Sequence, residues 1–159
     1  MELSKKVKTA LDETRMLILG AQVLLGFELR SAFSEGFDKL PGHAKHIEAL
    51  ALILMTISVA LMIAPGLYHR IVYSGEDSPD MHRVGSAMVT AATVPLALGL
   101  AGDIYVVIGK IIGPQTGLAA GVFGLIVLIG LWYAYPLAAA AMRRDAPGEA
   151  QAKPSGQRS

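Results

Sequence analysis

The sequence contains no cysteine, and this absence excludes a whole group of chemistries. Disulfide bonds, thiolate nucleophiles, iron–sulfur clusters and cysteine-ligated zinc all require the thiol group. Only carboxylate, imidazole and backbone groups remain as candidates for site chemistry.

Charged residues are also scarce, at 17% of the 159 residues, against about 25% in an ordinary soluble domain. The formal net charge of +1 gives no strong field toward nucleic acid, so no nucleic-acid partner is expected. Hydrophobic residues make up 53% of the chain. This balance predicts a membrane protein whose main partner is the lipid bilayer.

Four apolar segments are long enough to cross a membrane, which takes about 20 residues in a helix. The first apolar run, Met16–Phe27, is too short alone and has to continue past Glu28 and Arg30 to Phe33. We therefore predict an all-α fold, a polytopic transmembrane four-helix bundle, with spans at about 16–33, 47–68, 84–109 and 116–142. Residues 1–15 are predicted to form a cytoplasmic amphipathic juxtamembrane segment, and 143–159 a disordered cytoplasmic tail.

The distribution of basic residues predicts the orientation, because Lys and Arg collect on the cytoplasmic side. With both termini in the cytoplasm of a bacterium, the smaller set of basic residues lies outside: Arg30, Lys39, Lys45 and Lys110. We therefore expect a multi-pass protein of the inner membrane. A cleaved signal peptide is not expected, because Asp12 and Glu13 directly precede the first apolar run.

Polar side chains inside two of the spans form the first candidate site. Asp103 is the carboxylate of the third span, and Glu28, Arg30 and Gln22 lie in the first. An ionisable group inside a bilayer costs about 2.5–3.5 kcal/mol on insertion scales, so it usually has a partner or a function. One hypothesis is a structural ion pair of Arg30 with a carboxylate. The other is a proton or cation pathway through Glu28 and Asp103.

A second candidate site lies at the predicted cytoplasmic rim, where three helix ends bring acids, imidazoles and guanidinium groups to one level. A salt-bridge network is one hypothesis, and a metal, proton or ligand site is the other. No fixed-spacing metal motif such as HExxH is present, so no metal is predicted. The set comprises Asp12, Glu13, Arg15, His69, Arg70, His82 and Arg83.

The histidines do not predict haem, and no cofactor is expected. His43 and His46 precede the second span, and His69 follows it. A helix separates His46 from His69 by roughly 35 Å at ~1.5 Å per residue, too far to share one haem.

Glycines spaced four residues apart predict a close helix contact. Gly113, Gly117 and Gly121 share one helical face. Small residues at this spacing let two backbones approach in membranes. We expect this face to pack on another helix of the bundle or across a homo-oligomer.

Several stretches of residues 5–142 resemble an uncharacterised family of small bacterial four-helix membrane proteins. The most distinctive are Leu11–Met16, with the letters LDETRM, and Tyr68–Arg70, with the letters YHR. The resemblance implies the fold class and a bacterial membrane. It supplies no catalytic residue, and the label sodium:proton antiporter that is sometimes attached to the family adds none.

No catalytic motif is evident, so we predict no enzymatic activity and no catalytic residue. The sequence favours a structural, regulatory or partner-binding membrane subunit, which contacts another membrane subunit or its own copies. The alternative is a small proton or cation conductor or transporter that uses Asp103 and Glu28.

Overall fold

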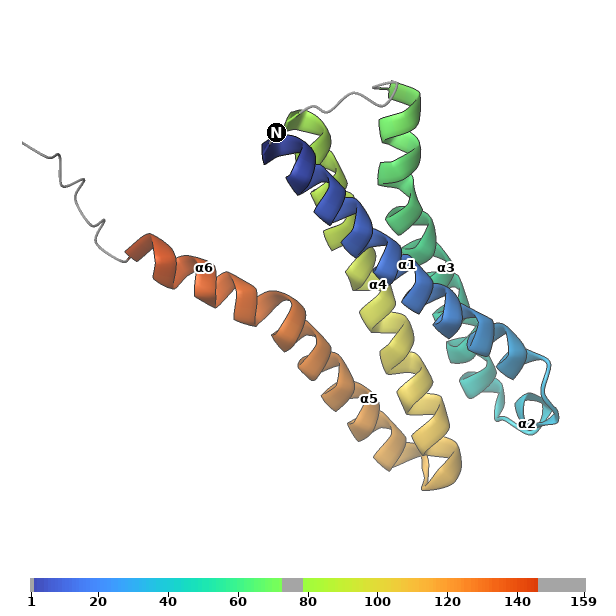
Figure 1. The fold of residues 1–159 in the computed structure, drawn as a ribbon. Helices are drawn as coiled ribbons and strands as arrows, with labels where there is room; N and C mark the ends of the chain where they lie inside the picture. Colours follow the sequence, from blue (N-terminus) through green and yellow to red (C-terminus); the bar gives the residue numbers. More distant parts are fainter. Residues whose placement is uncertain (1, 73–78, 146–159) are drawn as a thin grey trace, which may run out of the picture.

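The computed structural model describes residues 2–72 and 79–145, and all elements in these ranges are helices (Figure 1). In chain order they are α1 (Glu2–Ala32), α2 (Glu35–Asp38), α3 (Gly42–Val72), α4 (Pro79–Ile111), α5 (Pro114–Ile129), the π-helical turn η1 (Gly130–Ala134) and α6 (Tyr135–Asp145).

Three helical stretches of the described residues are long and apolar enough to cross a membrane: Gly42–Val72, Arg83–Ile111 and Pro114–Arg143. The all-helical architecture of a membrane protein is thus present. The fourth span, at 16–33, stays a prediction. Its residues and the proposed juxtamembrane segment form one continuous helix, α1. Of the predicted tail, residues 143–145 belong to α6, and 146–159 lie outside the described residues.

Helices α1, α3 and α4 form the main body, and α5 packs against α4 (Figure 1). The turn between α4 and α5 is short because Gly113 adopts a φ of 141°, which an L side chain rarely tolerates, and Pro114 starts α5. The run of α5, η1 and α6 then leans away from α1 as it returns along the molecule (Figure 1).

The core of the main body consists of small and flexible apolar side chains. One buried cluster contains Ala21 of α1, Met55, Val59 and Met62 of α3, and Ala92 and Leu96 of α4. Within it, the fully buried Ser58 hydroxyl donates a 2.7 Å hydrogen bond to the Ala92 carbonyl oxygen, which satisfies the polar group.

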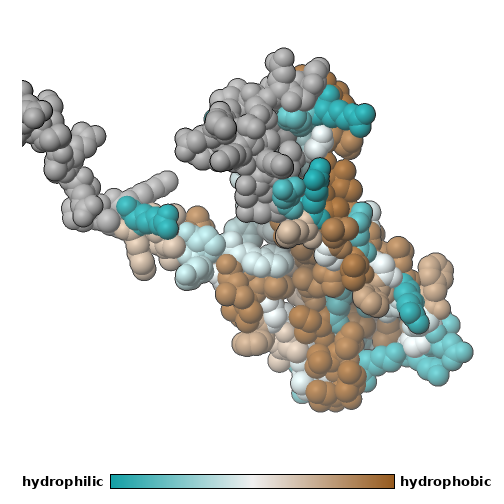
Figure 2. All heavy atoms as spheres, in the orientation of Figure 1, coloured by the Kyte–Doolittle hydropathy of each residue, from teal (hydrophilic) through white to brown (hydrophobic). Residues whose placement is uncertain are grey.

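Large apolar side chains cover the outside of the helices instead of filling the interior. Ile53, Leu67, Phe123 and Ile126 are all more than half exposed. Hydrophobic side chains cover much of the visible helical body in Figure 2, and hydrophilic ones lie at the end that carries α2, near the opposite end and on α6. In water such a surface would be unfavourable, but lipid tails are an equally apolar environment.

The glycine face lies at the α4–α5 contact. Gly117 and Gly121 are buried, and a Cβ added to Gly117 would lie 2.6 Å from the Gly109 Cα and from the Tyr105 carbonyl oxygen. Gly113 differs from the expectation, because a Cβ there would have no atom within 4 Å. Gly113 serves the turn, since it precedes the first residue of α5 and lies beyond the helix contact.

Candidate functional site

Three carboxylates from three different helices converge inside the main body. Glu28 comes from α1, Glu48 from α3 and Asp103 from α4. Each side chain has one carboxylate oxygen in the cluster, and these three oxygens all lie within 4.8 Å of one another. We call these three residues the carboxylate cluster.

The cluster is withdrawn from the surface. Glu28 and Glu48 are only 6% and 7% exposed, and Asp103 is half-buried. Counted along the helices, Glu48 lies about 9 Å from the start of α3 and Asp103 about 12 Å from the end of α4, at 1.5 Å per residue. All three carboxylates thus lie at similar depth near the end of the molecule that carries α2.

Helix geometry brings Ser31 to the cluster as well. Residues three apart share one face of a helix, so Ser31 lies beside Glu28 on α1. The Ser31 hydroxyl donates a 2.8 Å hydrogen bond to Glu48 Oε1 and thereby joins α1 to α3. Three other buried oxygens have no hydrogen-bond partner in the part of the chain that the structure describes: Glu28 Oε1, Glu48 Oε2 and Asp103 Oδ1.

Arg30 does not neutralise the cluster. Its side chain is exposed, and the ion pair found in the described part of the chain joins Arg15 to Asp12 instead. Each residue of a helix is rotated by about 100° from the one before it. Arg30 and Glu28, two residues apart, therefore point to nearly opposite sides of α1. The expected ion pair of Arg30 with Glu28 or Asp103 is therefore absent from the described residues. Gln22, the other polar residue expected nearby, is exposed.

Three carboxylates this close cannot all be ionised without compensation. Two unit charges 4 Å apart repel each other by about 4 kcal/mol at an effective dielectric constant near 20. Bound protons or a bound cation can remove this repulsion. Oxygen atoms within 4.8 Å of one another could also share one hard cation, because Ca²⁺ binds oxygen at about 2.4 Å.

The described residues of the second candidate site, at the predicted cytoplasmic rim, do not form a cluster comparable to the three carboxylates. Arg15 Nη1 and Asp12 Oδ1 form a 3.2 Å ion pair, but both side chains are more than half exposed. Arg70 and Arg83 are exposed, and His69 is half-buried with its Nε2 atom unpartnered. The side chains of Glu13 and His82 lie outside the described residues. An exposed pair such as Arg15–Asp12 contributes little stability.

Sequence reasoning missed Glu48, although a signal was present. The buried face of α3 runs through Ala44, Glu48, Ala51, Met55, Ser58 and Met62. This three-to-four spacing is that of a helix face turned to the protein interior. Glu48 is the acidic residue on that face, at the edge of the span predicted at 47–68.

Comparison with known proteins identifies a family for this chain, but the description of that family names no function. The model of DUF6328, described as a family of unknown function, matches residues 2–136. Neither a curated protein nor a solved structure matches the chain.

Proposed function

This chain belongs to DUF6328, and because that family has no known function, we propose from the carboxylate cluster that the protein is a small proton or cation conductor. The observation that carries the proposal is the gathering of Glu28, Glu48 and Asp103 in a buried site without a basic partner among the described residues.

The carboxylate cluster lacks a basic partner among the described residues, and this favours conduction over a structural ion-pair network. A structural ion-pair network would need Arg30 at the carboxylates, and Arg30 is exposed. A carboxylate with few partners in a low-dielectric setting is the usual working part of an ion pathway. A structural network without a basic partner would have to hold three acids together against their mutual repulsion.

The short distances within the carboxylate cluster allow a proton to move between neighbouring carboxyl groups. A proton bound to one carboxyl group of the cluster has two further carboxylates within 4.8 Å to accept it. The Ser31 hydroxyl keeps Glu48 Oε1 in place and leaves Glu48 Oε2 free of hydrogen bonds. A cation would be held by the same free oxygens, since hard cations prefer carboxylate ligands.

We expect purified protein in liposomes to pass protons or monovalent cations, and Glu48→Gln to reduce this flux to the level of protein-free liposomes. Gln keeps the size of Glu48 and can still accept the Ser31 hydrogen bond, but it can neither carry a proton nor attract a cation. A pH-sensitive or cation-sensitive dye inside the liposomes measures the flux.

Asp12→Asn is the matched control, because it removes an acid from an exposed ion pair outside the cluster. Its flux should equal that of the unmodified protein. Unmodified protein that passes neither protons nor monovalent cations between about pH 5 and pH 8 would refute conduction. Capture of a specific membrane subunit from native membranes, together with absent flux, would establish the partner-binding alternative.

We further propose four spans in a bacterial inner membrane with both termini cytoplasmic. The excess of Lys and Arg near the termini and near the α3–α4 connection supports this orientation. A reporter that is active only in the cytoplasm should be active when fused after Ala146 and inactive after Asp38. Activity after Asp38 would contradict the topology.

A further inference from the structure

A basic cavity and an apolar groove adjoin each other at the end of the molecule that carries α2. The basic cavity, of about 300 Å³, is lined by Lys39, His43 and Lys110 among others. The groove, of about 580 Å³, is lined almost entirely by apolar atoms. Tyr105 and Pro114 line both, so the two spaces are neighbours.

The charge of the basic cavity favours an anion. Lys39 follows α2, His43 lies in the first turn of α3 and Lys110 lies in the last turn of α4. None of the residues that line this cavity is acidic. Lys110 Nζ donates one hydrogen bond, of 2.9 Å, to the Gly36 carbonyl oxygen, which leaves two of its three N–H groups for a ligand.

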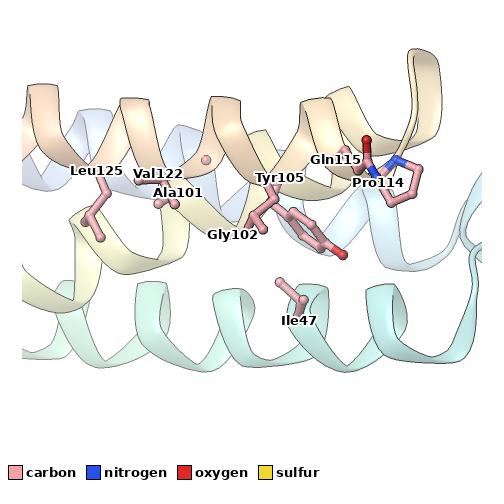
Figure 3. Close-up of a pocket in the computed structure, with 10 residues that line it drawn as sticks. Ile47, Ala101, Gly102, Tyr105, Pro114, Gln115, Val122 and Leu125 are labelled. Atoms are coloured by element: carbon pink, nitrogen blue, oxygen red, sulfur yellow. The ribbon is translucent and has the colours of Figure 1, made fainter.

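The groove continues from this cavity along the predicted membrane-spanning part of the helices. Three helices line it, with Ile47 from α3, Gly102 from α4, and Gly121, Val122 and Leu125 from α5. Figure 3 shows Tyr105 projecting from α4 into the space between α4 and α3, beside Ile47. A groove with this lining offers contacts to an alkyl chain and almost none to a polar solute.

We propose that this surface binds one anionic phospholipid, with its phosphate among Lys39, His43 and Lys110 and an acyl chain in the groove. A phospholipid carries its phosphate at the membrane surface and its chains below, which is the order in which the two spaces follow each other. Basic pockets between membrane helices recognise anionic headgroups in this way. The site shares no lining residue with the carboxylate cluster, and the proposal does not depend on conduction.

The test compares phosphatidylglycerol and phosphatidylcholine with identical acyl chains, added to the detergent-purified protein and counted by native mass spectrometry. Phosphatidylglycerol should bind more tightly. The double variant Lys39→Gln, Lys110→Gln should lower its affinity roughly thirtyfold and bring it to the level of phosphatidylcholine. Lys39→Gln alone, whose side chain makes no hydrogen bond to the described residues, should give about a fivefold loss.

Lys45→Gln is the charge-matched control, because Lys45 lies at the same end but outside the cavity lining and donates to the Asp38 carbonyl oxygen. It should leave lipid affinity unchanged. Val122→Trp should fill the groove and weaken both lipids while the protein keeps its elution volume. Equal binding of the two lipids, a loss in Lys45→Gln as large as in the double variant, or displacement of lipid by inorganic phosphate alone would each overturn the proposal.

Discussion

Gly117→Ala should destabilise the protein by about 3 kcal/mol or more, the upper end of what one inserted methyl group costs. The added Cβ would lie 2.6 Å from the Gly109 Cα, 2.6 Å from the Tyr105 carbonyl oxygen and 2.7 Å from the Gly109 nitrogen. All three atoms belong to the α4 backbone, so no side-chain rotation can relieve the contact. Helix α5 would have to move away from α4. Thermal unfolding in detergent measures the loss, and Gly117→Leu should be worse.

Gly130→Ala provides a control on the same helical run. A Cβ at Gly130 meets no atom within 4 Å, and alanine is favoured over glycine in a helix by about 1 kcal/mol. This variant should therefore unfold at the same temperature as the unmodified protein or slightly higher. Gly124→Ala should fall between the two, because its Cβ meets only the flexible Ile104 Cδ1 atom. If Gly117→Ala unfolds like Gly130→Ala, the α4–α5 contact does not hold the fold together.

The helices could be anticipated from the sequence because a bilayer leaves few alternatives. Backbone groups in lipid must bond within their own segment, so long apolar runs become helices. The segments at 47–68, 84–109 and 116–142 lie within the three apolar helical stretches of the structure. The boundaries were less predictable, since α3 continues through Pro65 to Val72. A proline inside a helix is tolerated when neighbouring groups satisfy the freed carbonyl.

The carboxylate cluster was only partly predictable. Glu28 and Asp103 were identified because acids within apolar runs are costly. That these two side chains meet Glu48 depends on how three helices rotate about their axes, and a list of residues does not specify those rotations. The hypothesis of an ion pair with Arg30 rested on its lying in the same third of the membrane as Glu28 and Asp103. A shared level does not fix the direction in which a side chain points, and the Arg30 side chain is exposed.

The three glycines spaced four residues apart do not all serve the helix contact that their spacing predicted. The four-residue spacing correctly brings Gly117 and Gly121 to one face, and both are buried against α4. Gly113 shares the spacing but precedes the first residue of α5, where its φ of 141° is needed for the turn. Periodicity alone could not separate these roles, because the end of a helix is set by local backbone geometry.

Asp103→Asn should stabilise the protein in detergent at pH 8 without divalent cations, by about 1–3 kcal/mol. The structure leaves Asp103 Oδ1 without a hydrogen-bond partner and places the side chain beside Glu28 and Glu48. Asparagine is close in size to aspartate but carries no charge, so the substitution removes repulsion without leaving a void. At ~4 Å and an effective dielectric constant near 20, one such repulsion is worth about 4 kcal/mol before compensation by protons. The gain should shrink at pH 5, because protons bound by the cluster relieve the same repulsion.

Combining Asp103→Asn with Arg30→Met distinguishes this account from a structural ion pair. Arg30 is exposed and unpaired among the described residues, so the effects of the two substitutions should add, with a coupling energy within about 0.5 kcal/mol of zero. An ion pair makes the opposite forecast: Asp103→Asn would be strongly destabilising because it leaves a buried guanidinium alone, and Arg30→Met would restore much of the loss. Asp12→Asn, in an exposed pair, should change stability by less than about 1 kcal/mol and sets the scale for a surface charge. A destabilised Asp103→Asn that Arg30→Met rescues would show that Arg30 balances the charge of the cluster, and no unbalanced charge would then support conduction.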